Sequence, residues 1–78
     1  MTERILIVDD EERIRKLLNL YLSREDYEIV EAENGKEALA LATEQDFHVI
    51  LLDLMMPEMD GIDVAKELRK EKSTPIIM

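Results

Sequence analysis

Residues 5–10 read Ile-Leu-Ile-Val-Asp-Asp, and residues 49–53 read Val-Ile-Leu-Leu-Asp. Each stretch is an aliphatic run that stops at an acidic residue. Short aliphatic runs of this kind are typical of parallel strands that are buried on both faces of a sheet. The two stretches therefore predict two interior strands, each followed directly by a carboxylate.

A helical spacing of apolar residues follows the first of these strands. Apolar residues recur at i, i+3, i+4, i+7 and i+8, which predicts an amphipathic helix with its apolar stripe at Ile14, Leu17, Leu18, Tyr21 and Leu22. Residues 27–32 largely alternate apolar and acidic side chains, which favours an edge strand. The Ala- and Leu-rich stretch 36–44 predicts a second helix, which Asn34 and Glu37 would open as a capping box.

The last third of the chain continues the alternation of strands and helices. Pro57 favours an extended loop before it, and Asp60 can cap a third helix that carries the apolar residues Ile62, Ala65 and Leu68. Residues 75–78 begin a further strand. The order β-α-β-α-β-α-β predicts an α/β fold, because its connections are long enough for parallel crossovers. We expect one domain over residues 1–78, a parallel sheet with flanking helices that ends in its fourth strand.

Composition narrows the classes of function. The 78 residues are 46% hydrophobic and 37% charged, and the longest apolar run is far shorter than the roughly 20 residues that span a bilayer. No signal peptide is apparent and no cysteine is present, so we expect a cytoplasmic protein without disulfides or thiolate metal sites. The formal net charge of −9 argues against direct nucleic-acid binding and suits a cation or a basic partner surface.

The acids that end the two aliphatic runs are the candidate site. In open α/β sheets, binding sites form beyond the carboxyl ends of the strands. If the two strands are neighbours, Asp9, Asp10 and Asp53 converge, and each pair at about 5 Å would repel by about 3 kcal/mol. Such a cluster must bind a cation or hold protons, and its all-oxygen ligands favour Mg²⁺, or alternatively Mn²⁺. The competing interpretation is that these acids only end strands and cap helices.

The same residues carry a resemblance to a known family. Residues 7–11 (Ile-Val-Asp-Asp-Glu), residues 51–57 (Leu-Leu-Asp-Leu-Met-Met-Pro) and the pair at 60–61 (Asp-Gly) resemble the signature of response-regulator receiver domains of two-component systems. The resemblance runs through the whole chain and implies a flavodoxin-like fold. The ending at 74–78 is similar to receivers of the OmpR/PhoB type, which carry a winged-helix DNA-binding domain downstream.

The resemblance implies a role for each residue of the cluster. Asp53 would accept a phosphoryl group from a phosphohistidine on a sensor histidine kinase. Asp10, Asp53 and the backbone carbonyl of Met55 would bind Mg²⁺, and Asp9 would act through a metal-bound water. The domain would then be a signalling module that controls a downstream DNA-binding output, rather than an enzyme.

The resemblance also sets expectations for the rest of the fold. Pro57 and Gly61 would shape the loop after the phosphate acceptor. Complete receivers continue beyond the fourth strand and carry a switch Thr or Ser and a phosphate-contacting Lys there. We therefore expect a partial receiver in which phosphorylation is impaired, and in which the exposed fourth strand favours self-association.

Three alternatives to the signalling module stay open. An aspartate-nucleophile phosphatase would place a second Asp two residues after the nucleophile, where this chain has Met55. A flavin or nucleotide binder would need a phosphate-binding loop after the first strand, where residues 9–12 are all acidic. The third alternative is a structural fragment that assembles without phosphotransfer.

A few other residues have a chemical and a structural interpretation. His48 could serve a phosphorelay or a metal, although packing at the start of a strand is the simpler role. The methionines at 55, 56 and 59 could bind a soft metal, although packing again is simpler. Basic residues, which fall largely on the solvated face of the first helix, could dock the kinase: Arg13, Arg15, Lys16 and Arg24.

Overall fold

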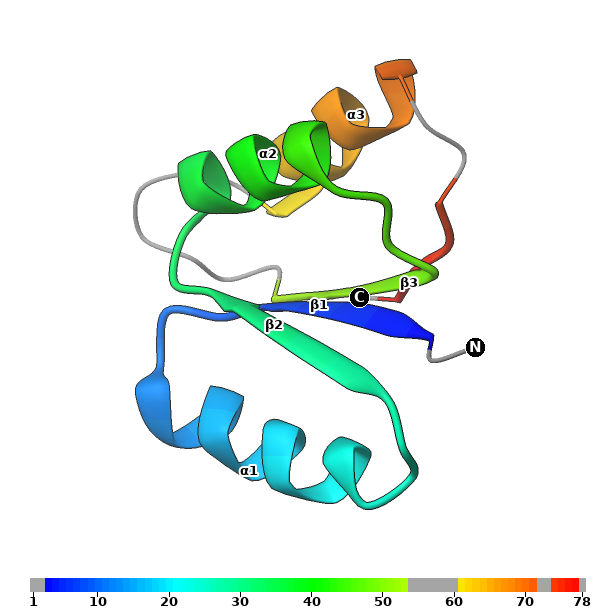
Figure 1. The fold of residues 1–78 in the computed structure, drawn as a ribbon. Coiled ribbons are helices and arrows are strands. Elements are labelled where there is room, and N and C mark those ends of the chain that lie inside the picture. Colours follow the sequence, from blue (N-terminus) through cyan, green and yellow to red (C-terminus); the bar gives the residue numbers. More distant parts are fainter. Residues whose placement is uncertain (1–2, 54–60, 72–73, 78) are drawn as a thin grey trace.

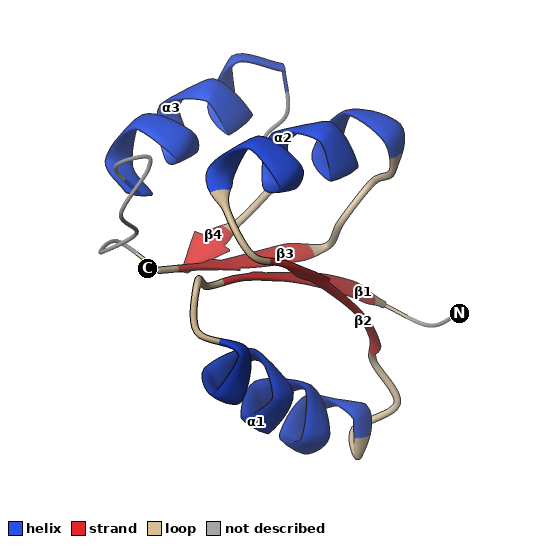
Figure 2. Cartoon of the chain, turned by 90° about the vertical axis from the view of Figure 1, so that its left-hand side faces the viewer, coloured by secondary structure: helices blue, strands red, loops and turns tan. Residues whose placement is uncertain are grey.

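The computed structural model describes residues 3–53, 61–71 and 74–77. Within this part, the strands are β1 (Arg4–Val8), β2 (Glu28–Ala32), β3 (Val49–Leu52) and β4 (Ile76–Ile77), and the helices are α1 (Glu12–Ser23), α2 (Gly35–Glu44) and α3 (Gly61–Glu71). The strands form one parallel sheet in the order β2-β1-β3-β4. Helix α1 covers one face of the sheet, and α2 and α3 cover the other (Figures 1 and 2). The predicted element order and α/β fold class are confirmed.

The aliphatic runs form the two interior strands, as predicted. Residues 5–8 of β1 are all buried, and the outer strands are β2 and β4. Because side chains alternate across a strand, Leu6 and Val8 enter the core beneath α2 and α3, whereas Ile5 and Ile7 face α1. Burying each of these side chains contributes about 1.5–3 kcal/mol, and β1 supplies apolar side chains to both layers.

The core beneath α2 and α3 is assembled from small and branched residues. Its buried members from outside β1 are Ala32, Ala38, Ala42, Phe47, Ile50, Leu52, Val64 and Leu68. The alanines of α2 let that helix lie close to the sheet. The Asn34 half of the predicted capping box is confirmed, because Asn34 Oδ1 accepts a hydrogen bond of 2.8 Å from the backbone N–H of Glu37.

Helix α3 differs in detail from its predicted apolar face. Leu68 is buried and Ala65 is half-buried, but Ile62 is 51% exposed and Val64 is fully buried in its place. Val64 and Leu68 are one turn apart and face the sheet together. Ile62 lies two residues before Val64, roughly 200° around the helix, and therefore cannot share that face.

Helix α1 departs further from the expectation. None of its residues is fully buried, and Leu18 and Leu22 are half-buried. The rest of the predicted apolar stripe is 39–58% exposed, namely Ile14, Leu17 and Tyr21. The helix is rolled by about a quarter turn from the predicted orientation, so that Arg15 and Asn19 face the sheet. The expectation that Arg15 lies on the solvated face was wrong, since its side chain is only 11% exposed.

The polar contacts of α1 converge on Glu31 of β2. Arg15 Nε lies 3.2 Å from Glu31 Oε1, and Lys16 Nζ and Asn19 Nδ2 lie 3.4 and 2.8 Å from Oε2. Burial raises the pKa of the Glu31 carboxyl, but the hydrogen bond from Asn19 and the positive charges of Lys16 and Arg15 outweigh it, so that the pKa lies below its ordinary value. Glu31 therefore holds α1 to the sheet as a carboxylate.

Glu31→Gln tests this attachment through the pH dependence of stability. A carboxyl whose pKa is lower in the folded than in the unfolded state stabilises the fold above its ordinary pKa of 4.5 and loses this effect as pH falls through the folded value. We expect the variant to lose about 1–2 kcal/mol near neutral pH, measured by urea unfolding. The gap to the wild type should narrow steadily below pH 4.5.

A matched control is Glu28→Gln on the same strand. Glu28 pairs with Arg4 at 3.3 Å, but the two side chains are 52% and 34% exposed. Exposed pairs contribute little, so this variant should unfold close to the wild type at every pH. Equal losses in the two variants would contradict a special role for Glu31.

Candidate metal centre

The site lies where β1 and β3 end, and the pairing of these strands builds it. Val8 is in register with Leu52, so that Asp9 and Asp53 follow at matching positions. The backbone N–H of Asp53 donates to the Val8 carbonyl at 2.9 Å, and that of Asp9 donates to the Ala32 carbonyl at 3.1 Å. The hydrogen-bond ladder thus extends one residue past each strand and fixes both aspartate backbones.

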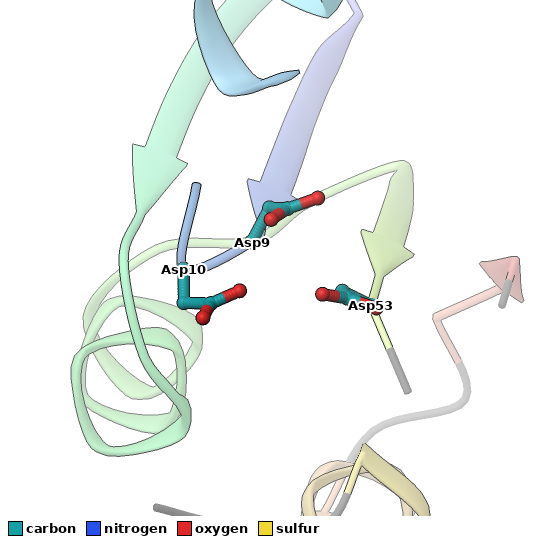
Figure 3. Close-up of side chains that lie close together, drawn as sticks. All are labelled: Asp9, Asp10 and Asp53. Carbon is teal, nitrogen blue, oxygen red and sulfur yellow. The ribbon is translucent and has the colours of Figure 1, made fainter. Parts of the chain in front are cut away.

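Three carboxylates converge there, as predicted. One oxygen from each of Asp9, Asp10 and Asp53 lies within 4.8 Å of the others. Figure 3 shows the carboxylates of Asp10 and Asp53 pointing toward one another across the gap between the two strand ends, with Asp9 beside them. Asp9 and Asp53 are half-buried and Asp10 is exposed, so the cluster opens to solvent on one side.

Asp9 is restrained at both its side chain and its backbone carbonyl. Its Oδ1 accepts a hydrogen bond of 2.9 Å from the backbone N–H of Glu11, an Asx turn that leads into α1. Its backbone carbonyl accepts a hydrogen bond of 2.7 Å from Nη1 of Arg15. The peptide that joins Asp9 to Asp10 is therefore held from the side of α1.

The donor set fits a hard divalent cation. Mg²⁺ prefers oxygen ligands and keeps several waters, so one or two carboxylates at an open edge suit it. A cavity of about 250 Å³ adjoins the cluster and is lined by Asp9, Asp53 and apolar residues that include Ile7 and Leu51. This space lies on the face of the sheet that α1 covers only in part.

Some predicted site residues fall outside the described part of the chain. These are Met55, with the backbone carbonyl expected to bind the metal, and Pro57, together with Met56 and Met59. Gly61 is the first residue of α3. The loop-shaping roles of Pro57 and Gly61 therefore stay predictions.

His48 lies at the amino end of β3, opposite the acidic cluster. The imidazole Nδ1 of His48 accepts a hydrogen bond of 2.9 Å from the backbone N–H of Arg4. The backbone N–H of His48 donates to the Arg4 carbonyl at 2.8 Å. Both bonds join the start of β3 to the start of β1. This arrangement supports the structural interpretation of His48.

The sequence did not predict that Arg15 and Glu31 form an ion pair next to the site. The available signal was an acid at position 31 between apolar Val30 and Ala32 at the end of a strand. An acid at that place needs a cation, and the helix before it offers Arg15. No local pattern links the two, because they are 16 residues apart in the chain.

Comparison with known proteins agrees with the geometry. The family model described as the response regulator receiver domain matches residues 5–78. A curated relative, the transcriptional regulatory protein SrrA of Staphylococcus aureus, is 64% identical over all 78 residues. The chain spans about a third of the length of that relative, 32%.

Solved structures show the same fold. The response regulator TrrA of Thermotoga maritima, in complex with Mg²⁺-BeF, matches with a TM-score of 0.93 and 46% identity, over 99% of this chain and 68% of its own. The chemotaxis protein CheY4 of Vibrio cholerae matches with a TM-score of 0.93 and 38% identity, over 97% and 66%. TrrA in complex with the histidine kinase ThkA matches with a TM-score of 0.89 and 46% identity, over 96% and 66%.

The sequence resemblance, the shared fold and the family match over nearly the entire chain agree, and the protein belongs to the response regulator receiver domains.

Proposed function

We propose that this domain receives a phosphoryl group on Asp53 from a sensor histidine kinase, in a site that binds Mg²⁺. The observation that carries the proposal is the convergence of three carboxylates within 4.8 Å at the ends of β1 and β3, in a chain of the receiver family. A lone strand-ending acid would carry little weight, because such acids are common. Three in one open crevice repel one another, and a bound cation would offset that repulsion.

In this proposal Asp10, Asp53 and the Met55 carbonyl would hold the cation, and it would supply positive charge against the transferred oxygens. Asp9 would act through a metal-bound water, and its Oδ1 already accepts a hydrogen bond from the backbone N–H of Glu11. The Mg²⁺-BeF complex of TrrA, which shares this fold, supports Mg²⁺ as the cation. Mn²⁺ would fit the same oxygen ligands.

The transfer exchanges one bond to phosphorus for another. A carboxylate oxygen of Asp53 forms the new O–P bond, while the N–P bond to the kinase histidine breaks and the imidazole leaves with the electron pair. The ladder bond from Asp53 N–H to Val8 holds the acceptor in place. The product acyl phosphate is labile, which suits a reversible signal.

The expected partners follow from the same proposal. The complex of TrrA with the kinase ThkA supports a sensor kinase as the phosphodonor. The exposed basic residues Arg13 and Lys16 of α1, and Arg24 directly after it, are candidates for docking the kinase. The 64% identity with a transcriptional regulatory protein supports an OmpR/PhoB-type regulator whose DNA-binding output lies outside this acidic segment.

Asp53→Asn tests the acceptor. With Mg²⁺ and a small-molecule phosphodonor, the wild type should gain the mass of one phosphoryl group. We expect no gain in Asp53→Asn or after chelation of the metal. Asp63→Asn, at an exposed aspartate of α3, should react like the wild type.

The opposite results are equally informative. A phosphoryl gain in Asp53→Asn would show that another residue is the acceptor. No gain in a wild type that circular dichroism shows to be folded would favour the structural, assembling function.

Asp10→Asn tests the metal site by calorimetry. Removal of a direct ligand should weaken Mg²⁺ binding by about tenfold or more. The same change removes a repulsive charge, so the metal-free variant should melt at a higher temperature than the metal-free wild type. Asp63→Asn should change neither the Mg²⁺ affinity nor the melting temperature. Unchanged Mg²⁺ affinity in Asp10→Asn would contradict the proposed ligand set.

Self-association is a second candidate function that a specific observation favours. Ile77 on the outer strand β4 is 58% exposed, and Leu17 and Tyr21 on α1 are 48% and 58% exposed. An apolar edge strand invites pairing with another chain. A second copy of the domain is the partner that this function would use.

Ile77→Lys tests this candidate. We expect the wild type to sediment as a dimer or larger species at micromolar concentration, and Ile77→Lys to sediment as a monomer, because a charged edge opposes strand pairing. Ile62→Lys, at an exposed isoleucine of α3, is the matched control and should associate like the wild type. A folded, monomeric wild type would end this candidate.

A further inference from the structure

The guanidinium of Arg15 joins two parts of the fold that the acidic cluster depends on. Its Nη1 donates to the Asp9 carbonyl at 2.7 Å, and its Nε lies 3.2 Å from Glu31 Oε1 on β2. The Arg15 and Glu31 side chains are only 11% and 17% exposed. Charge-assisted hydrogen bonds that are shielded from water hold their geometry well.

The bond to the Asp9 carbonyl acts on the next residue. A peptide unit is planar, so fixing the carbonyl oxygen of Asp9 also fixes the direction of the Asp10 N–H and the start of the Asp10 backbone. The other restraints on Asp9 act at its N–H and its side chain. Asp10 itself is exposed, so the place of its carboxylate depends on this backbone.

We propose that Arg15 is a positioning residue for the acidic site, which holds the Asp9–Asp10 peptide against Glu31 so that the Asp10 carboxylate faces Asp53. The inference rests on the proposed Mg²⁺ site for its effect on affinity. Its effect on the order of the Asp10 backbone does not need the metal.

The sign of the effect separates positioning from simple electrostatics. A positive charge near a cation site repels the cation, so removing Arg15 would tighten Mg²⁺ binding if only charge mattered. If Arg15 acts by positioning, its removal weakens binding, although the site becomes more negative. The charge of Arg15 is in any case balanced by Glu31.

The chain provides a matched control one residue away. Lys16 carries the same charge on the same helix and lies 3.4 Å from the same carboxylate, but its side chain is 65% exposed. The hydrogen bond to the Asp9 carbonyl comes from Arg15. Lys16→Met therefore removes the charge and a Glu31 contact without removing the contact to Asp9.

The experiment compares Arg15→Met, Arg15→Lys and Lys16→Met in two measurements. By calorimetry, we expect Mg²⁺ affinity to fall about tenfold in Arg15→Met. It should fall less in Arg15→Lys. In Lys16→Met it should equal the wild-type affinity or rise slightly. By ¹⁵N relaxation without metal, the Asp10 amide should become more mobile in Arg15→Met and not in Lys16→Met. Lysine cannot reproduce the two-sided guanidinium contact, so rescue should be partial.

Each result decides something. Tighter or unchanged Mg²⁺ binding in Arg15→Met, or an Asp10 amide as rigid as in the wild type, would overturn the positioning role. A wild type that binds no Mg²⁺ would end the proposed metal site, while the relaxation measurement would still decide the inference. If Arg15→Met does not fold, Arg15→Lys carries the same comparison with Lys16→Met.

Discussion

The parallel pairing of β1 with β3 is the constraint on which the rest of the structure depends. Its register sets Val8 beside Leu52 and therefore Asp9 beside Asp53. The same pairing buries all of residues 5–8 of β1 and Ile50 and Leu52 of β3, which contributes about 1.5–3 kcal/mol for each large side chain. This burial opposes the repulsion of the carboxylates at the strand ends. The apolar core thus holds together acids that would separate in an unfolded chain.

The sequence predicted those elements of the fold that a local pattern of residues determines. An aliphatic run that ends in an acid identifies an interior strand, and Asn34 with Glu37 identifies the start of α2. The sequence did not show that β1 and β3 are neighbours, because alternating β and α segments are compatible with several strand orders. The predicted convergence of the acids depended on that pairing. The observed order β2-β1-β3-β4 meets that condition and brings the three acids together.

The orientation of α1 could not be predicted in the same way. Periodicity shows which residues share a helix face, but it does not show how far the helix is rolled on the sheet. That roll depends on Glu31, which lies 16 residues from Arg15 and makes no repeating pattern with it. The rotation of α3 about its axis could not be predicted either. Val64 rather than Ile62 faces the core, because packing against neighbouring elements decides which apolar residue is buried.

The roll of α1 exchanges apolar burial for polar contacts. Leaving Ile14, Leu17 and Tyr21 about half exposed forgoes about 1 kcal/mol each. The charge-assisted bonds to Glu31 and to the Asp9 carbonyl offset part of this loss. The observed orientation holds the peptide between Asp9 and Asp10 through the Arg15 hydrogen bond. A rigid helix cannot bury its full apolar stripe and keep that contact, so the exposed apolar surface of α1 is a direct consequence of how the acidic site is built.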